Sequence, residues 1–102
     1  MSIVKNTLHI PAVNGTIQRA GNILAVTHHF GIATDAPATG TLKIEARPPG
    51  ATVFEVVPGA EALDLAALDS VQVTGVIEEY EITLTSVTGA TEIVITDSCE
   101  VV

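Results

Sequence analysis

β-Branched residues constrain the fold of this chain more than any other feature. Valine, isoleucine and threonine account for 36 of its 102 residues, and their branched side chains fit a pleated strand better than a helix. The hydrophobic share is 47%, but only 3% of the residues are aromatic, so the core has to be built mainly from aliphatic side chains. We therefore expect an all-β protein.

Short stretches of alternating apolar and polar residues, separated by turn-forming residues, predict the strands. In the clearest stretch, 41–47, Leu42, Ile44 and Ala46 alternate with polar residues. The expected strands are 2–10, 16–19, 22–30, 41–47, 52–57, 70–74, 77–85 and 91–97, and 61–68 is expected to be an extended crossover or one loose turn. Seven or eight short strands are typical of an antiparallel β-sandwich, either Ig-like or a small jelly roll.

The length favours one domain, 1–102, because about 100 residues is the usual domain size and two halves would each be too small to fold readily. The small and polar stretch 34–40 reads as a linker. It divides the domain into N-terminal strands, 1–39, and a core of the sandwich, 40–98. We expect the first part to form a hairpin layer that contacts a partner.

Turn chemistry predicts two hairpins. Asn14-Gly15 suits a tight turn between the first two strands, and 86–90 should join the last two strands in the same way. The last strand carries apolar residues on both faces, which indicates a central or covered position.

Strand 77–85 contains a conflict in its alternation. Tyr80, Ile82 and Leu84 should face the core, and Glu78 would then share their inward face. A bulge or a strand end near Glu78 would remove the conflict.

Charge is distributed unevenly along the chain, whose formal net charge is -8. All four Lys and Arg residues lie in 1–47, which has a formal charge of +2, whereas 48–102 has a charge of -10 and no base. Such an acidic protein repels nucleic acid, so we exclude DNA and RNA binding. The excess acid either only keeps the protein soluble, or it marks the first half as the side that meets an acidic partner.

No apolar run approaches the roughly 18 residues that cross a bilayer, and the N-terminus lacks the apolar block of a signal peptide. We therefore expect no membrane partner. Cys99 is the only cysteine, which rules out an internal disulfide framework and a zinc site built on cysteines. Its neighbour Glu100 disfavours the thiolate, so the thiol is expected to be a spectator.

Catalytic chemistry needs a nucleophile with a base in reach, surrounded by polar loops, and no such arrangement stands out. We expect no enzyme activity, no catalytic residue and no cofactor. Two metal sites come into question: His9 with His28 or His29 and Asp35, and, for calcium, Glu78, Glu79 and Glu81 with Asp97. Solvated or hydrogen-bonded side chains explain both patterns better, so no metal site is expected.

The run GTLKIEARPPGATVFEVVPGA, 40–60, and the run ALDLAALDSVQVTGVIEEYEITLTSVTGATEIVITD, 62–97, together resemble small β modules of virion structural proteins from tailed bacteriophages. The shared features are a GTL-type strand, an RPPGA-like turn, an F-E-x-x-P strand, an L-D-L segment and two strands around a V-T-G turn. The resemblance spans 40–97, about 58 residues. It implies a non-enzymatic part of the particle: capsid decoration or cement, which we prefer, a head fibre, or a tail accessory protein.

The resemblance also implies a location in the virion, synthesis in the bacterial cytoplasm, and contacts with other virion proteins and with further copies of the chain in a homo-oligomer. From the charge division we place the candidate partner interface in the first third. Its residues are Ile3, Val4, Lys5, Arg19, His28 and His29. The first three lie on a strand that could add to a partner's sheet.

A carbohydrate-binding or adhesion module is the alternative function, because small β-sandwiches often serve that role. Sugar rings need exposed aromatic faces to stack on. The chain has no Trp, and Phe54 and Tyr80 lie in expected strands where the core would claim them.

Overall fold

The computed structural model describes residues 2–67 and 70–101, whose regular elements are all β-strands. The strands are β1 (Ser2–Pro11), β2 (Gly15–Ala20), β3 (Ala25–Thr34), β4 (Thr39–Arg47), β5 (Glu55–Val56), β6 (Leu63–Asp64), β7 (Val71–Thr74), β8 (Glu79–Thr88) and β9 (Glu92–Val101). Within these residues no helix is present that could cross a membrane. Seven strands have four or more residues, which agrees with the expected number.

The strands pair in a nested order. β1 pairs with β9, β2 with β8, β3 with β7, and β4 with β5 and β6, all antiparallel. The chain thus doubles back on itself as one long hairpin that reverses after β4. Two further antiparallel pairs, β3 with β9 and β4 with β8, wind this hairpin into two sheets.

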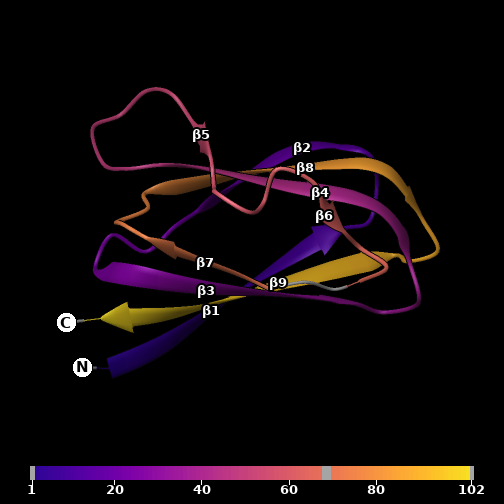
Figure 1. The fold of residues 1–102 in the computed structure, drawn as a ribbon, viewed down its shortest axis with the longest axis horizontal. Coiled ribbons are helices and arrows are strands. Elements are labelled where there is room, and N and C mark those ends of the chain that lie inside the picture. Colours follow the sequence, from indigo (N-terminus) through magenta and orange to yellow (C-terminus); the bar gives the residue numbers. More distant parts are fainter. Residues whose placement is uncertain (1, 68–69, 102) are drawn as a thin grey trace.

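The two sheets have the strand orders β1-β9-β3-β7 and β2-β8-β4-β5, with β6 also paired to β4. Figure 1 shows them as two layers, with the two ends of the chain side by side. The result confirms the all-β sandwich. A long hairpin wound into two sheets is the jelly-roll arrangement, so the jelly-roll alternative describes this topology and the Ig-like alternative does not.

Both predicted hairpins are wrong, because consecutive strands lie in opposite sheets. β1 and β2 are unpaired with each other, and the Asn14 side chain instead accepts a hydrogen bond from the Val87 N–H (2.8 Å). β8 and β9 are likewise in different sheets. The turn chemistry correctly marks where the chain reverses, but it does not determine whether the reversal stays within one sheet.

The expected N-terminal layer is absent from the described strands. β1 and β3 flank β9, and β2 lies beside β8, so the strands of 1–39 are interleaved with those of the C-terminal part. Of the expected linker 34–40, only 35–38 is a connection, and it joins β3 in one sheet to β4 in the other. The central position expected for the last strand is confirmed, because β9 lies between β1 and β3.

The core fills the space between the sheets. One sheet contributes Leu8, Ile10, Phe30, Ile32, Ile93 and Ile95, and the other contributes Leu42, Ile44, Tyr80, Ile82 and Leu84. Burying one such aliphatic side chain stabilises the fold by about 1.5–3 kcal/mol. The inward row of β8 is as predicted, and β8 begins at Glu79, which confirms the strand end expected near Glu78.

Two predicted segments are shorter than expected. Strand 52–57 is reduced to β5, because only Glu55 and Val56 pair with β4 and the chain turns at Pro58. Val57 N–H adds one hydrogen bond to the Ile44 carbonyl (2.9 Å). The segment 61–68 contains β6 followed by a turn closed by Ala67 N–H and the Asp64 carbonyl (3.1 Å), and its last residue lies outside the described residues.

The charge polarity along the chain is not a polarity in space. The nested pairing sets strands of the +2 segment beside strands of the -10 segment. Arg47 Nε pairs with Glu79 (3.1 Å), and His9 Nδ1 lies 3.5 Å from Glu92. The hypothesis that the first half forms a separate, less acidic face is therefore wrong.

Candidate functional site

The structure separates the six candidate interface residues into three groups. Ile3, Val4 and Lys5 are exposed on β1, at the edge of the sheet. His29 is exposed on β3 and shares a row with Lys5, because both pair with Ser98 of β9. Arg19 is half-buried on β2.

The sixth candidate, His28, is wrongly assigned to the interface. Its side chain is fully buried between the sheets, where no partner can reach it. The physical reason is strand alternation, because His28 lies two residues before Phe30 and four before Ile32 and therefore falls in the same inward row.

β1 and β2 form one side of the sandwich, and each has an outer edge that pairs with no other described strand. Five of the eight exposed large hydrophobic side chains lie on these strands or on the connections next to them. They are Ile3, Val4, Val13, Ile23 and Leu24. Val4, Ile23 and Leu24 also line an open groove between the start of β1 and the β2–β3 connection. This side therefore presents unpaired backbone and apolar side chains together.

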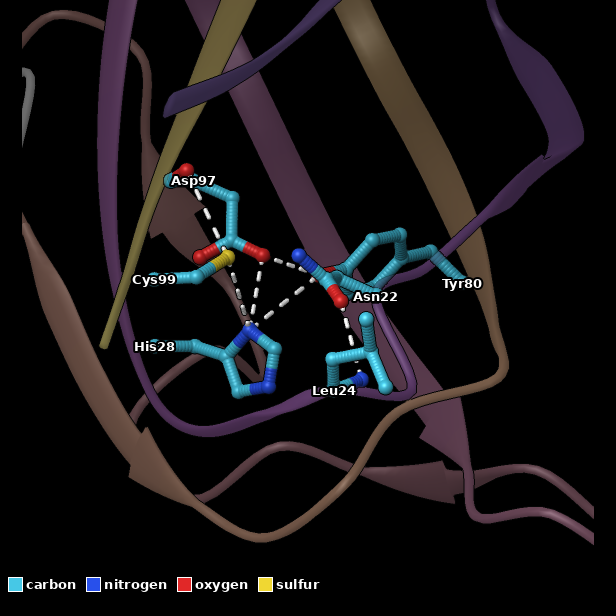
Figure 2. Close-up of polar contacts among 6 residues, drawn as sticks. All are labelled: Asn22, Leu24, His28, Tyr80, Asp97 and Cys99. Carbon is cyan, nitrogen blue, oxygen red and sulfur yellow. Dashed lines mark hydrogen bonds and ion pairs between the residues drawn. The ribbon is translucent and has the colours of Figure 1, made fainter. Parts of the chain in front are cut away.

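A second candidate site is a buried polar cluster inside the sandwich. It consists of His28, Tyr80, Asp97 and Cys99 (Figure 2), each with at most 1% of its surface exposed. Asp97 and Cys99 follow Ile93 and Ile95 in the inward row of β9, and His28 lies opposite Cys99 on β3. Tyr80 reaches across from β8 in the other sheet.

The polar atoms of the cluster converge on one point. His28 Nδ1 lies 2.7 Å from Asp97 Oδ2, and the Tyr80 hydroxyl donates to the same carboxylate oxygen. Tyr80 Oη and Cys99 Sγ lie 3.4 and 3.5 Å from His28 Nδ1. In Figure 2 these four groups point toward one another from three strands. The arrangement fixes the two sheets against each other at this end of the core.

Burial keeps the two acidic protons of the cluster in place. Desolvation raises the pKa of the Tyr80 hydroxyl far above its usual range, and the hydrogen bond to Asp97 adds to this. Desolvation, with a smaller contribution from Asp97, raises the pKa of the Cys99 thiol to about 12. At neutral pH both groups are therefore protonated and serve as hydrogen-bond donors.

The cluster contains Cys, His and Asp but lacks the geometry of a nucleophilic triad. A triad places the nucleophile on one ring nitrogen of histidine and the carboxylate on the other. Here Cys99 Sγ and Asp97 Oδ2 both approach Nδ1, and Nε2 has no partner among the described residues. With its raised pKa, the Cys99 thiol is also a poor nucleophile.

The two metal sites considered from the sequence are not assembled. Among the described residues, His9 and Asp35 do not come together with either His28 or His29 at ligand spacing. His28 is buried, whereas His9 is exposed beside Glu92 and Asp35 accepts hydrogen bonds from Thr91. The calcium set also fails, because Asp97 is fully buried in one sheet while the partly exposed residues Glu79 and Glu81 belong to the other.

The three aromatic side chains offer little to a sugar. Phe30 and Tyr80 are buried and pack edge to face, with ring centroids 5.6 Å apart. Phe54 is half-buried, and the guanidinium of Arg47 lies 5.8 Å from its ring centroid. Stacking of the kind that carbohydrate-binding modules use would need an open aromatic face.

The sequence contained a signal for the polar cluster that the strand analysis did not use. Continuing the inward row Ile93-Ile95 by two residues at a time reaches Asp97 and then Cys99. Ending the last strand at 97 hid this row. His28 can be assigned in the same way, because counting two residues back from the apolar Phe30 places His28, and not the adjacent His29, in the inward row of its strand.

No protein-family model and no curated protein sequence matches the chain. Among solved structures, it is similar to the Yersinia pseudotuberculosis-derived mitogen, with a TM-score of 0.54 and 13% identity over 96% of this chain and 85% of that one. Because the identity is low, this similarity concerns the fold alone, and it agrees with a β-sandwich that includes nearly the whole chain.

Two further solved structures match with lower TM-scores. One is from the disulfide-linked endospore appendages of Bacillus, with a TM-score of 0.45 and 20% identity over 99% of this chain and 90% of that one. The other is the nucleoplasmin-like N-terminal domain of Drosophila FKBP39, with a TM-score of 0.45 and 12% identity over 98% and 91%.

Proposed function

We propose that this chain is a non-enzymatic structural protein of a phage particle that decorates the capsid and binds a neighbouring virion protein through the free edge of β1. The proposal combines two independent supports. The first is the open side of the sandwich, and the second is the resemblance of 40–97 to virion structural modules.

The observation that carries the proposal is the state of β1. It is ten residues long, its outer edge pairs with nothing in 2–67 and 70–101, and Ile3 and Val4 near its start are 67% and 44% exposed. A long free edge with apolar side chains favours addition of a strand from another chain. Backbone hydrogen bonds would supply the affinity, and the apolar side chains would favour one register.

The charge of β1 favours an acidic partner. The strand carries Lys5 and His9 and no acidic residue, in a chain whose net charge is -8. A neighbouring strand with Asp or Glu opposite Lys5 would gain a cross-strand ion pair. Further copies of this chain are also acidic, so we include homo-oligomerisation in the proposal.

The test is the protein composition of purified particles. Particles banded from a bacterial strain whose phage or prophage encodes this chain should contain it at a fixed number of copies per major capsid protein. Its absence from such particles, together with binding to a glycan array, would overturn the proposal in favour of the carbohydrate-binding alternative.

The edge itself is tested with the double variant Ile3→Asp, Val4→Asp. Both side chains are exposed, so the fold should persist, while occupancy on stripped particles should fall at least about tenfold, since like charges opposite acidic strands oppose pairing. Val53→Asp is the matched control, because Val53 is 69% exposed but lies far along the chain on the segment before β5. Equal binding by both variants would exclude β1 as the contact.

A further inference from the structure

We propose that His28, Asp97 and Cys99 bind a divalent transition-metal ion of the zinc class inside the sandwich, with the Tyr80 hydroxyl beside its fourth coordination position. This inference does not depend on the proposed function. It rests on the convergence of the donor atoms, on their burial and on their unfilled hydrogen-bonding capacity.

The donor atoms have the spacing of a ligand set. One donor atom from each of His28, Asp97 and Cys99 lies within 4.8 Å of the others, and all three side chains are buried. Bond lengths of about 2.0–2.3 Å in a tetrahedral site place ligand atoms roughly 3.3–3.8 Å apart. The 3.5 Å between Cys99 Sγ and His28 Nδ1 falls in this range.

The distance between His28 Nδ1 and Asp97 Oδ2, 2.7 Å, is that of a hydrogen bond. An ion would therefore have to separate these two atoms by several tenths of an ångström. Because Asp97 has a side chain with two rotatable bonds, a small rotation is enough. The site is thus one in which protons and a cation are alternative occupants of the same centre.

Hydrogen bonding alone leaves the cluster incompletely satisfied. His28 Nε2 and Asp97 Oδ1 are buried and have no hydrogen-bond partner among the described residues, and such atoms are rare in native proteins because each costs about 1–3 kcal/mol. If a cation binds Asp97 Oδ2, the Tyr80 hydroxyl is free to donate to Oδ1 instead. Metal binding therefore gives one of the two orphan atoms a partner.

The charges also match. A buried carboxylate and a thiolate together carry two negative charges, which a divalent cation neutralises, so the occupied site is electrically balanced. On binding, the Cys99 sulfur exchanges its proton for the cation, and that proton leaves to solvent. The proton with which His28 Nδ1 donates to Asp97 moves to Nε2, so that Nδ1 is free to coordinate the ion. Although the pKa of Cys99 is raised without an ion, direct coordination supplies the interaction that deprotonates a buried thiol.

The donor types indicate which cation fits. Thiolate sulfur and imidazole nitrogen select zinc and similar borderline metals, whereas calcium and magnesium prefer sites made of oxygen alone. Three protein ligands leave a fourth position, and Tyr80 Oη lies 3.4 Å from His28 Nδ1, within the ligand separations of such a site.

The experiment uses cobalt(II) as a spectroscopic probe of the full chain. Because the cluster is closed to solvent, the protein is unfolded in urea with a chelator, freed of both, and refolded with one equivalent of CoCl₂. We expect a thiolate-to-cobalt charge-transfer band in the near ultraviolet, saturation at one ion per chain, loss of the band on adding ZnCl₂, and a Tm several degrees above that of metal-free protein.

Variants distinguish the cluster from other binding. Cys99→Ala should abolish the charge-transfer band, and His28→Gln should weaken Zn²⁺ binding at least about 100-fold, since each removes a direct ligand. The double variant His9→Ala, His29→Ala is the matched control, because both of these histidines are exposed, and it should bind like the wild type.

The wild-type spectrum keeps the test decisive if a cluster variant does not fold. Folded wild-type protein that gives no charge-transfer band and no Tm shift with either metal would overturn the proposal. Loss of the band in the His9 and His29 variant would also overturn it, because the ion would then be bound at the surface.

Discussion

The two sides of the sandwich differ in the length of their edge strands. On one side, β1 and β2 have ten and six residues, and the outer edge of each is free. On the other side, the outermost strands β5 and β7 have only two and four residues. Short edge strands and prolines are common means of preventing sheet edges from pairing with other chains. Among the described strands, only the β1–β2 side has long edge strands, and its one proline, Pro11, is the last residue of β1.

The connection after β4 closes the second side. Pro48, Pro49 and Pro58 flank β5 and cannot donate to a ladder. Arg47 holds this connection in place, because it pairs with Glu79, contacts the Phe54 ring and donates to the Ala51 carbonyl (3.2 Å). The contrast indicates that the open side is where another chain can add, and each prediction below tests how differently the two sides are built.

The largest expected effect concerns how β1 is anchored. Ile10 is 1% exposed at the end of β1, so Ile10→Ala should lower the free energy of unfolding by about 2–5 kcal/mol through the cavity it leaves. On the closed side, Val56 of β5 is 39% exposed, and Val56→Ala should cost about 0.5 kcal/mol or less.

Urea denaturation of both variants measures this difference. A similar loss in the two would show that β5 is packed as firmly as β1, contrary to the comparison. Because Ile10 is part of the core, a deletion of residues 1–10 would destabilise the fold and could not test partner binding by itself. Only the start of β1 is exposed.

The second prediction concerns the connection from β2 to β3 on the open side. Gly21 N–H donates to the Glu78 carbonyl (2.8 Å), and a Cβ added to Gly21 would overlap the carbonyl oxygen of Ile77. Gly21→Ala should therefore cost about 1–3 kcal/mol, since backbone has to move to relieve the overlap. Gly31→Ala is the control, because its added Cβ meets no atom within 4 Å.

Thermal unfolding of the two glycine variants gives the answer. A control that loses as much stability as Gly21→Ala would mean that the overlap with Ile77 is relieved without cost. If Gly21→Ala is destabilised as expected, the connection from β2 to β3 is rigid. The groove that Val4 and Leu24 line beside β1 is then already formed before a partner binds.

The third prediction concerns the closed side. Arg47→Met keeps an apolar stem but removes the ion pairs with Glu79 and Glu78 and the hydrogen bond to the Ala51 carbonyl. Arg47 is 22% exposed, so solvent screens the pairs only in part, and we expect a loss of about 1–2 kcal/mol. Limited proteolysis should then cut within 48–54 faster than in the wild type.

Lys43→Met is the matched control for this variant. Lys43 pairs with Glu45 at 3.3 Å but is 39% exposed and holds no loop, so its loss should stay below about 0.5 kcal/mol. Unchanged proteolysis in Arg47→Met, or equal losses in the two variants, would show that prolines alone close this side.

How far the sequence predicted the fold depends on the range of the interactions involved. Alternation is a local property, and it correctly placed Leu42, Ile44 and Tyr80 in the core and ended the strand near Glu78. Pairing between β1 and β9 joins residues more than 80 positions apart, and no pattern in either strand specifies the other. The nearest-neighbour hairpins were therefore predicted in place of the nested pairs.

The candidate site shows the same limit. The N-terminal strand was correctly located, but alternation places Val4 on the face of the buried Leu8 and Ile10, so the 44% exposure of Val4 was not predictable from the pattern. The buried cluster was predictable only in part. Inward rows reach Asp97, Cys99 and His28, but His28 and Asp97 approach each other only once β3 and β9 pair, and no local pattern specifies that pairing.

The smallest expected effect belongs to neither side of the sandwich and sets a baseline for the comparison. Asp35, in the connection between β3 and β4, accepts hydrogen bonds from the Thr91 hydroxyl and from the N–H groups of Glu92 and Thr91, which lower the pKa of its carboxyl below the usual 3.8. A carboxyl whose pKa is lowered in the folded state stabilises that state above its unfolded pKa, and this stabilisation is lost as the pH falls through the folded pKa. Asp35→Asn should therefore lower Tm slightly at pH 6, and the difference from the wild type should shrink steadily below pH 3.8. A difference in Tm that stays constant between pH 6 and pH 2 would show that Asp35→Asn changes only the geometry of these hydrogen bonds. The charge of Asp35 would then contribute nothing to stability.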